Sequence, residues 1–158
     1  MATIPVTKRG AEKLKEELHR LKTVERHAVI RAISEARAQG DLSENAEYEA
    51  AKDKQGFIEG RILEIDSKLA AAQVIDPASL DAGGRVVFGA TVDLEEEASG
   101  QAVTYQIVGD DEADLKQGLI SISSPIARSM IGKEAGDVAE VQAPSGVKRY
   151  EIVEVRYV

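Results

Sequence analysis

Hydrophobic residues recur at intervals of three and four in two long segments of the N-terminal half of the chain. The first segment begins after Thr7, a residue suited to cap a helix, and extends to about Gln39. Its apolar positions are Leu14, Leu18, Leu21, Ala28, Val29, Ala32 and Ile33. The second segment extends from about Ser43 to Val74, with apolar positions at Tyr48, Ala51, Ile58, Ile62, Ile65, Leu69 and Ala72. The spacing predicts two helices that pair as an antiparallel coiled-coil hairpin.

The chain is predicted to reverse direction between these helices at residues 40–44. Gly40 is suited to the left-handed conformation that ends a helix. Asp41 with Glu44 three residues later matches a capping box, in which both side chains accept hydrogen bonds from backbone N–H groups. Carboxylates exposed at the end of a hairpin also have spare lone pairs for a ligand. Both interpretations of the two acids stay open on spacing alone.

The pattern changes at Asp76 and Pro77, because proline has no N–H group with which to continue a helix. Alternation of hydrophobic and polar positions then predicts strands over 85–94, 101–108, 119–123, 138–143 and 149–158. A short helix is predicted from Ser124 to about Ile131. We therefore predict an α+β fold, with a coiled-coil hairpin over residues 1–76 and a small antiparallel-sheet domain with one helix over residues 77–158.

Composition and charge restrict the class of protein and its partners. The 158 residues include no cysteine, which excludes disulfides and thiolate metal sites. No apolar run reaches the length of a membrane span, and the first ten residues lack the apolar stretch of a signal peptide. We therefore expect a cytoplasmic protein with no membrane partner.

The net charge of −8 is unevenly distributed along the chain. Residues 76–158 carry 15 acidic and 7 basic residues, whereas residues 8–75 carry 13 of each. Such an acidic C-terminal half repels phosphate backbones, so binding of a free duplex by counterion release is not expected of it. Any contact with nucleic acid should come from local basic residues on the hairpin.

Two glycines lie within the second predicted helix, four residues apart, at Gly56 and Gly60. Each costs about 1 kcal/mol relative to alanine in an exposed helix interior. We interpret them as a place where the two helices approach closely or where the helix bends.

Four segments give a more specific signal: Glu35 to Tyr48, Gln55 to Ile62, Ile107 to Asp114, and Ser123 to Arg128. Together they resemble the GreA/GreB family of bacterial transcript cleavage factors, and the resemblance extends over essentially the full chain. It implies a coiled coil that enters the secondary channel of RNA polymerase and an FKBP-like C-terminal domain that docks at the rim of that channel. It also implies a factor that is not itself an enzyme but activates Mg²⁺-dependent cleavage of the nascent RNA 3′ end by a backtracked polymerase.

The resemblance assigns roles to particular residues. Asp41 and Glu44 correspond to the family's tip acids, which help to hold a weakly bound second Mg²⁺ in the polymerase active site. Arg37 and Lys52 are placed toward the displaced RNA or the channel wall. Lys52 stands where the family has an arginine, which keeps the charge but loses bidentate phosphate geometry. Docking on the polymerase is implied for Ser123, Ser124, Pro125, Ile126 and Arg128, whose alternative interpretation is a capped helix of the core.

Several other functions remain as alternatives. The near-neutral hairpin favours the branch of the family with the less basic coiled coil. An inhibitory paralogue that blocks the same channel is disfavoured only by the sequence of residues 41–44. A prolyl isomerase needs an aromatic-lined apolar pocket, and the region after Asp76 offers few aromatic residues. A coiled-coil scaffold would recruit a second chain, but two helices of equal length satisfy each other, so we expect a monomer.

Overall fold

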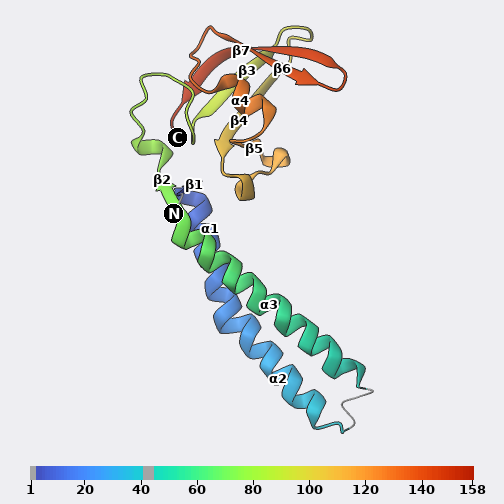
Figure 1. The fold of residues 1–158 in the computed structure, drawn as a ribbon. Coiled ribbons are helices and arrows are strands. Elements are labelled where there is room, and N and C mark those ends of the chain that lie inside the picture. The colour runs from blue at the N-terminus through green and yellow to red at the C-terminus, as the bar shows by residue number, and fades with distance from the viewer. Residues whose placement is uncertain (1–2, 41–44) are drawn as a thin grey trace. The chain divides into compact units, whose positions relative to one another are not determined.

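The computed structural model describes residues 3–40 and 45–158, and these divide into two compact units (Figure 1). The first unit comprises residues 11–72. The second comprises residues 3–10 together with residues 73–158. The grouping differs from the predicted division at residue 76, because the start of the chain packs with the C-terminal residues. None of the helices in the described part of the chain has the length and apolarity that a membrane-spanning helix requires.

The first unit is a hairpin of two helical arms (Figure 1). One arm consists of α1 (Lys8–Arg20), the π-helical segment η1 (Leu21–Glu25) and α2 (Arg26–Arg37), and the other is α3 (Ala46–Ala71). The first three residues of α1 group with the second unit. The predicted cap of the first helix is confirmed, because the backbone N–H of Gly10 donates to the Thr7 hydroxyl over 3.1 Å. Both predicted helices are present, and the first is interrupted by the π-helical turn.

This π-helical turn displaces the apolar seam of the first arm by one residue. Upstream of η1, the seam follows the predicted spacing and includes Leu14, Leu18 and Leu21, which are half-buried. Downstream, the buried positions are Val29, Ile33 and Ala36, whereas Ala28 and Ala32 are exposed. A π-helical turn accommodates one residue more than an α-helical turn, so the seam resumes at position 29 instead of 28. The facing residues of α3 are buried as predicted at Ala51, Ile58, Ile62 and Ile65.

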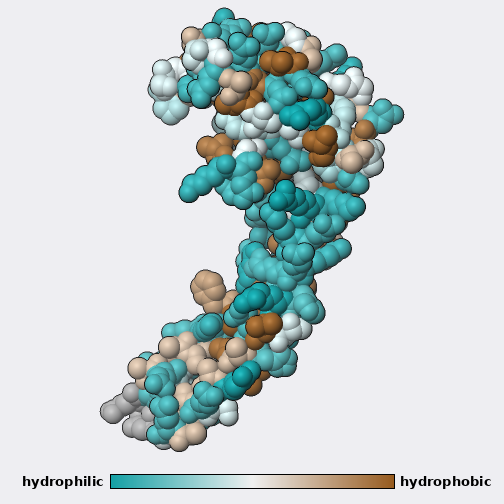
Figure 2. Space-filling view, turned by 180° about the vertical axis from the view of Figure 1, so that it is seen from behind, coloured by the Kyte–Doolittle hydropathy of each residue, from teal (hydrophilic) through white to brown (hydrophobic). Residues whose placement is uncertain are grey.

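Gly56 and Gly60 lie on the exposed side of α3. A Cβ atom added at either position would meet nothing within 4 Å, so the predicted close approach of the helices at these glycines is wrong. The neighbouring Phe57 and Leu63 are 83% and 68% exposed. In the space-filling view, hydrophobic residues are scattered among hydrophilic ones on the surface of the hairpin (Figure 2). This side of α3 contributes no packing within the hairpin.

The second unit contains a five-stranded sheet with the strand order β5-β4-β3-β7-β6. Its strands are β3 (Thr91–Glu96), β4 (Ala102–Val108), β5 (Leu119–Ser121), β6 (Val138–Ala143) and β7 (Gly146–Arg156). Neighbouring strands are antiparallel except for β4 and β5, which are parallel. The predicted antiparallel sheet is therefore observed except at β5, whose pairing with β4 is parallel. The connection over residues 109–118 carries the chain back along the sheet before β5 begins, and it contains two short 3₁₀ turns, η3 (Asp110–Glu112) and η4 (Leu115–Gln117).

One helix, α4 (Pro125–Met130), supplies two fully buried residues, Ala127 and Met130, to the core of this unit. The other members of the core cluster are Val86, Val92, Leu94, Ile107, Ile120, Ala139 and Ile152. Helix and strands share this one core, and the predicted α+β fold class is confirmed.

The small sheet formed by the start of the chain and the segment after α3 was not predicted from the sequence. β1 (Ile4–Thr7) and β2 (Ala72–Ile75) form a separate two-stranded sheet, so the second helix ends at Ala71 and not at Val74. The 3₁₀ turn η2 (Pro77–Ser79) follows, and the Asp76 carboxylate accepts a hydrogen bond from the N–H of Ala78 over 3.1 Å. The predicted strand over 85–94 begins only at Thr91, because Gly89 adopts a positive φ of 89° just before it.

Candidate functional site

The reversal of the hairpin is fixed on both sides by described residues. Gly40 has a φ of 108°, as expected for a glycine that follows a helix. The N-cap of α3 is Asn45, whose side chain accepts from the N–H of Tyr48 over 3.0 Å. The Asn45 amide also donates to the carbonyl of Ala36 over 2.8 Å and so joins the two arms. The described cap of α3 is thus Asn45, and Asp41, which was predicted to cap this helix, lies outside the described residues.

The two predicted metal ligands, Asp41 and Glu44, lie outside the described residues. Within residues 3–40 and 45–158, no group of three or more His, Cys, Asp or Glu side chains is arranged to hold a metal ion. Carboxylate oxygens are the ligands that Mg²⁺ takes, usually one or two from a protein together with water and substrate phosphates.

Arg37 and Lys52, the predicted RNA or channel contacts, line the same hollow near the reversal. The hollow has a volume of about 300 Å³ and is also lined by Ile30, Ile33, Ser34 and Gln55. The Lys52 ammonium donates to the Gln55 side-chain oxygen over 3.2 Å. Apolar and cationic groups thus meet at one surface, which suits a ligand with an uncharged ring and a phosphate group.

Further from the reversal, basic residues of the hairpin form ion pairs between its two arms. Arg61 makes a bidentate contact with Glu17, with N–O distances of 2.6 and 2.8 Å, and Arg26 makes one with Glu59, with distances of 3.0 and 2.8 Å. By contrast, no carboxylate among the described residues forms an ion pair with Arg37 or Lys52. Arg26 and Arg61 therefore join the two arms, whereas Arg37 and Lys52 make no such ion pair with a described residue.

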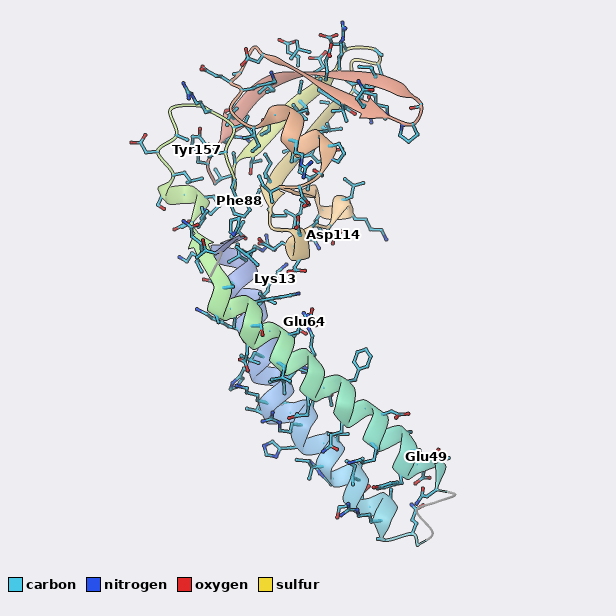
Figure 3. The ribbon with its side chains drawn as sticks, viewed as in Figure 1. Lys13, Glu49, Glu64, Phe88, Asp114 and Tyr157 are labelled. Carbon is cyan, nitrogen blue, oxygen red and sulfur yellow. The ribbon has the colours of Figure 1, made fainter. Side chains whose placement is uncertain are left out.

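These ion pairs also shift the pKa values of acids on the hairpin. The hydrogen bonds from Arg61 hold the pKa of the Glu17 carboxyl below its ordinary value, although burial acts in the opposite direction. Glu64, which projects from α3 in Figure 3, is contacted by Lys68 at 2.9 Å and by Arg61 at 3.2 Å. The bond from Lys68 is the main cause of the lowered pKa of Glu64. The acids of this network are therefore charged at neutral pH.

The predicted docking residues of the second unit divide into two groups. Ser123, Pro125 and Arg128 are exposed. Ser124 caps α4, because its hydroxyl accepts from the N–H of Ala127 over 3.3 Å, and Ile126 packs partly buried against the core. The alternative interpretation as a capped core helix thus describes Ser124 and Ile126. The three exposed residues are available to a partner.

Sequence reasoning missed two acids that organise this region, Asp110 and Glu112. The Asp110 carboxylate accepts hydrogen bonds from the hydroxyls of Ser121 and Ser123, and these bonds lower its pKa. Glu112 accepts from the Thr7 N–H over 3.1 Å, from the Thr7 hydroxyl, and from the Gly109 N–H over 2.9 Å. The available signals were the acidic run after β4 and the family resemblance of Ile107 to Asp114, and neither identifies these partners.

A family model described as "Transcription elongation factor, N-terminal" matches residues 4–74, and one described as "Transcription elongation factor, GreA/GreB, C-term" matches residues 81–157. The chain is 76% identical to transcription elongation factor GreA of Verminephrobacter eiseniae (strain EF01-2) over 157 residues, which cover 99% of each chain. It is 73% identical to GreA of Polaromonas naphthalenivorans (strain CJ2), with 100% of each chain covered.

Among solved structures, GreA factor homolog 1 (Gfh1) of Thermus thermophilus is 27% identical, with 98% of this chain and 99% of that chain covered and a TM-score of 0.43. The assignment to a family depends on the sequence matches and not on this structural overlap. Family models match both parts of the chain, and the relatives align with nearly its whole length. This chain belongs to the GreA/GreB family of transcription elongation factors.

Proposed function

We propose that this elongation factor inserts its hairpin into the secondary channel of RNA polymerase and stimulates Mg²⁺-dependent cleavage of backtracked nascent RNA. The observation that carries the proposal is the match to GreA/GreB models over both parts of the chain, with an acid-containing reversal at the end of the hairpin. A backtracked polymerase has its RNA 3′ end displaced from the active centre. Hydrolysis of an internal phosphodiester bond makes a new 3′ end from which synthesis resumes.

Asp41 and Glu44 are the residues proposed to act at the reaction centre. When bound, Mg²⁺ supplies stabilisation of the leaving oxygen and activation of the attacking water. The carboxylates of Asp41 and Glu44 would bind it together with polymerase and RNA groups, which explains why the isolated factor is expected to have no nuclease activity. Repulsion between two such carboxylates is only about 1 kcal/mol at 4 Å in water, so both can stay ionised before binding.

Arg37 and Lys52 are proposed to contact the displaced RNA. Both are free of carboxylate ion pairs among the described residues, and both line the hollow that Ile30 and Ile33 share. A cation beside an apolar surface can hold a phosphate while a base lies on the apolar part. Lys52 provides charge without the bidentate geometry of arginine, so the contact positions the RNA without fixing it rigidly.

The second unit is proposed to dock on the polymerase through its exposed residues Ser123, Pro125 and Arg128, beside the partly buried Ser124 and Ile126. The factor is proposed to act as a monomer in the cytoplasm. Val29, Ile33 and Ile62 are already buried between the arms of one hairpin, so a second chain is not needed to cover them.

The test is a stalled, backtracked elongation complex with end-labelled RNA, incubated with the parent protein, Asp41→Asn or Glu44→Gln. We expect Mg²⁺-dependent shortening of the RNA with the parent. We expect the cleavage rate to fall by more than about hundredfold in each variant, which corresponds to a loss of several kcal/mol of transition-state stabilisation. Glu49→Gln is the matched control, since Glu49 is an exposed acid near the start of α3 (Figure 3).

The binding of each variant to the elongation complex is measured in parallel, so that loss of chemistry is separated from loss of binding. Retained binding with lost cleavage supports the assignment of the two acids. Cleavage by both variants at the parental rate would overturn it. A parent protein that binds the complex and only blocks cleavage would replace the proposed function with that of a channel inhibitor.

A further inference from the structure

The exposed docking residues follow a short loop that is held by a connected set of polar contacts. The Ser123 hydroxyl donates to the Asp110 carboxylate over 2.6 Å, and the Ser121 hydroxyl donates to the same oxygen. The backbone N–H of Ser123 donates to the Ser121 hydroxyl oxygen over 3.1 Å. The Ser124 hydroxyl donates to the Ser121 carbonyl over 2.6 Å. The side chains of residues 121–124 and the Asp110 carboxylate therefore form one connected set of contacts.

Asp110 reaches this loop from a different part of the sheet. It is the first residue of η3, two residues after the end of β4, whereas the loop begins at Ser121, the last residue of β5. Main-chain pairing between β4 and β5 already brings the two segments together, and Ile122 donates from its N–H to the Val108 carbonyl over 2.8 Å. The Asp110 carboxylate is the group that extends this connection beyond the sheet to Ser123, the first exposed residue of the docking segment.

The bonds made by Asp110 have little consequence for folding. Asp110 and Ser123 are both exposed, so water would satisfy their polar groups if the bonds were absent. The two serine hydroxyls lower the pKa of Asp110, with a smaller contribution from the charge of Arg128, so the acceptor is ionised at neutral pH. A charged acceptor gives shorter and more directional hydrogen bonds than a neutral one. Their main effect is to select one conformation for the loop.

We propose that Asp110 is a positioning residue for polymerase docking, an inference that rests on the proposed function. Its carboxylate holds residues 121–124, so that Ser123, Pro125 and Arg128 form one preorganised binding surface. Without it, the loop must be ordered when the complex forms. Ordering of side chains and loops at an interface reduces affinity without removing any contact of the final complex. Asp110 thus affects how tightly the factor binds and leaves the rate of cleavage in the bound complex unchanged.

The experiment measures transcript cleavage against factor concentration for the parent, Asp110→Ala and Asp110→Asn. From the usual cost of immobilising interface side chains, we expect about a five- to tenfold higher half-saturating concentration for Asp110→Ala, with the same plateau rate. Asp110→Asn retains a carbonyl acceptor and should recover part of the loss. Asp81→Asn, which removes another exposed carboxylate of the same unit, should behave like the parent.

A second variant shows whether a loss of affinity in Asp110→Ala comes from the loop contacts or from another effect of removing the carboxylate. Ser121→Ala deletes a hydroxyl that donates to Asp110 and lies outside the proposed docking residues. If Asp110 and Ser121 act through one loop conformation, their effects are not additive. The loss of affinity in the double variant should then be smaller than the sum of the losses in the two single variants. Urea midpoints measured on all variants should change little.

The outcomes separate this inference from the proposed function. A parent protein that neither binds nor cleaves would overturn the proposed function itself. A parent that cleaves, together with an Asp110→Ala variant of unchanged half-saturating concentration, would overturn only the role of Asp110. A fall in the plateau rate at saturating Asp110→Ala would also overturn it, because that result places Asp110 in the reaction and not in docking.

Discussion

The hairpin and the C-terminal unit are each stabilised by a different arrangement of internal contacts. The core cluster of the C-terminal unit contains nine buried residues, most of them with no exposed surface. The corresponding cluster of the hairpin contains three, Val29, Ile58 and Ile62, with Leu18 and Leu21 partly buried beside them. The hairpin adds bidentate ion pairs along its length, at Glu17 with Arg61 and at Arg26 with Glu59. One unit depends on a concentrated core and the other on interactions repeated along two arms.

This difference matters for how each unit responds to damage. A core enclosed on all sides cannot collapse onto a missing side chain, so a cavity remains and the whole unit is affected. Two helices in contact along one seam can shift locally and close part of a gap. The hairpin should therefore lose stability locally, whereas the second unit should lose it cooperatively.

The largest expected effect is from a matched pair of core truncations, Ile107→Ala in the second unit and Ile62→Ala in the hairpin. Ile107 has no exposed surface and Ile62 is 4% exposed, so the same atoms are removed from two buried sites. We expect Ile107→Ala to cost about 3–5 kcal/mol and Ile62→Ala about 2 kcal/mol, because the seam relaxes more easily. Urea unfolding followed by tyrosine fluorescence and by circular dichroism at 222 nm measures the two units.

The two signals weight the units differently, because three of the four tyrosines, Tyr105, Tyr150 and Tyr157, lie in the second unit, whereas most helical residues lie in the hairpin. Val147→Ala, at an exposed valine of β7, is the control and should change stability by less than about 0.5 kcal/mol. Equal losses at Ile107 and Ile62 would contradict the contrast between an enclosed core and a relaxing seam.

The next effect concerns the contact between Glu112 and the start of α1. A Cβ atom at Gly10 would lie 2.0 Å from the Glu112 Oε1 atom, so Gly10→Ala forces the carboxylate away from Thr7. Thr7 is only 3% exposed, and its N–H would then lack its partner. We expect Gly10→Ala to destabilise the second unit by about 1–3 kcal/mol, measured from the urea midpoint of the tyrosine signal.

A double-mutant cycle makes this prediction sharper. In the Glu112→Ala background the clash is gone, and alanine is the better helix former, so Gly10→Ala should become stabilising by about 0.5–1 kcal/mol. Glu112→Gln, which keeps an acceptor in place, should be less harmful than Glu112→Ala. A Gly10→Ala substitution that is equally destabilising in both backgrounds would show that Glu112 is not the obstacle.

Much of the hairpin followed from its sequence, because a three-four spacing of apolar residues specifies a helical seam directly. The error came at η1, where the pattern Ala28-Val29 and Ala32-Ile33 offered two adjacent registers. The π-helical turn selects the second register, and the larger side chains are then buried. The close approach predicted at the glycines of α3 was wrong, because a cost in helix propensity does not indicate which face of the helix is affected.

In the C-terminal unit, turn residues and alternation predicted most strands, including β6 with its observed bounds. The direction of β5 could not be read, because alternation fixes the faces of a strand and not its orientation in the sheet. Asp110 and Glu112 could not be assigned either. Glu112 finds its partner at Thr7, and only the folded chain brings two such distant residues together.

The smallest expected effect is that of the Glu17–Arg61 ion pair, which tests whether charge pairs stabilise the hairpin. Both side chains are partly exposed, so we expect Glu17→Gln to cost only about 0.2–1 kcal/mol at pH 7. Because folding lowers the pKa of Glu17, its contribution is fully present above the ordinary glutamate pKa and is lost as the pH falls through the lower folded value. The difference between parent and variant should therefore disappear in acid.

The measurement is the urea midpoint of the helical signal at pH 7 and at pH 2.5, with and without 1 M salt. Glu16→Gln removes the adjacent exposed carboxylate and serves as the control. Salt should reduce the difference in urea midpoint between the parent and Glu17→Gln at pH 7, because screening weakens an exposed ion pair. A gap that persists unchanged in acid would assign the loss to the packing of the Glu17 side chain and not to its charge, and the hairpin would then depend on its seam alone.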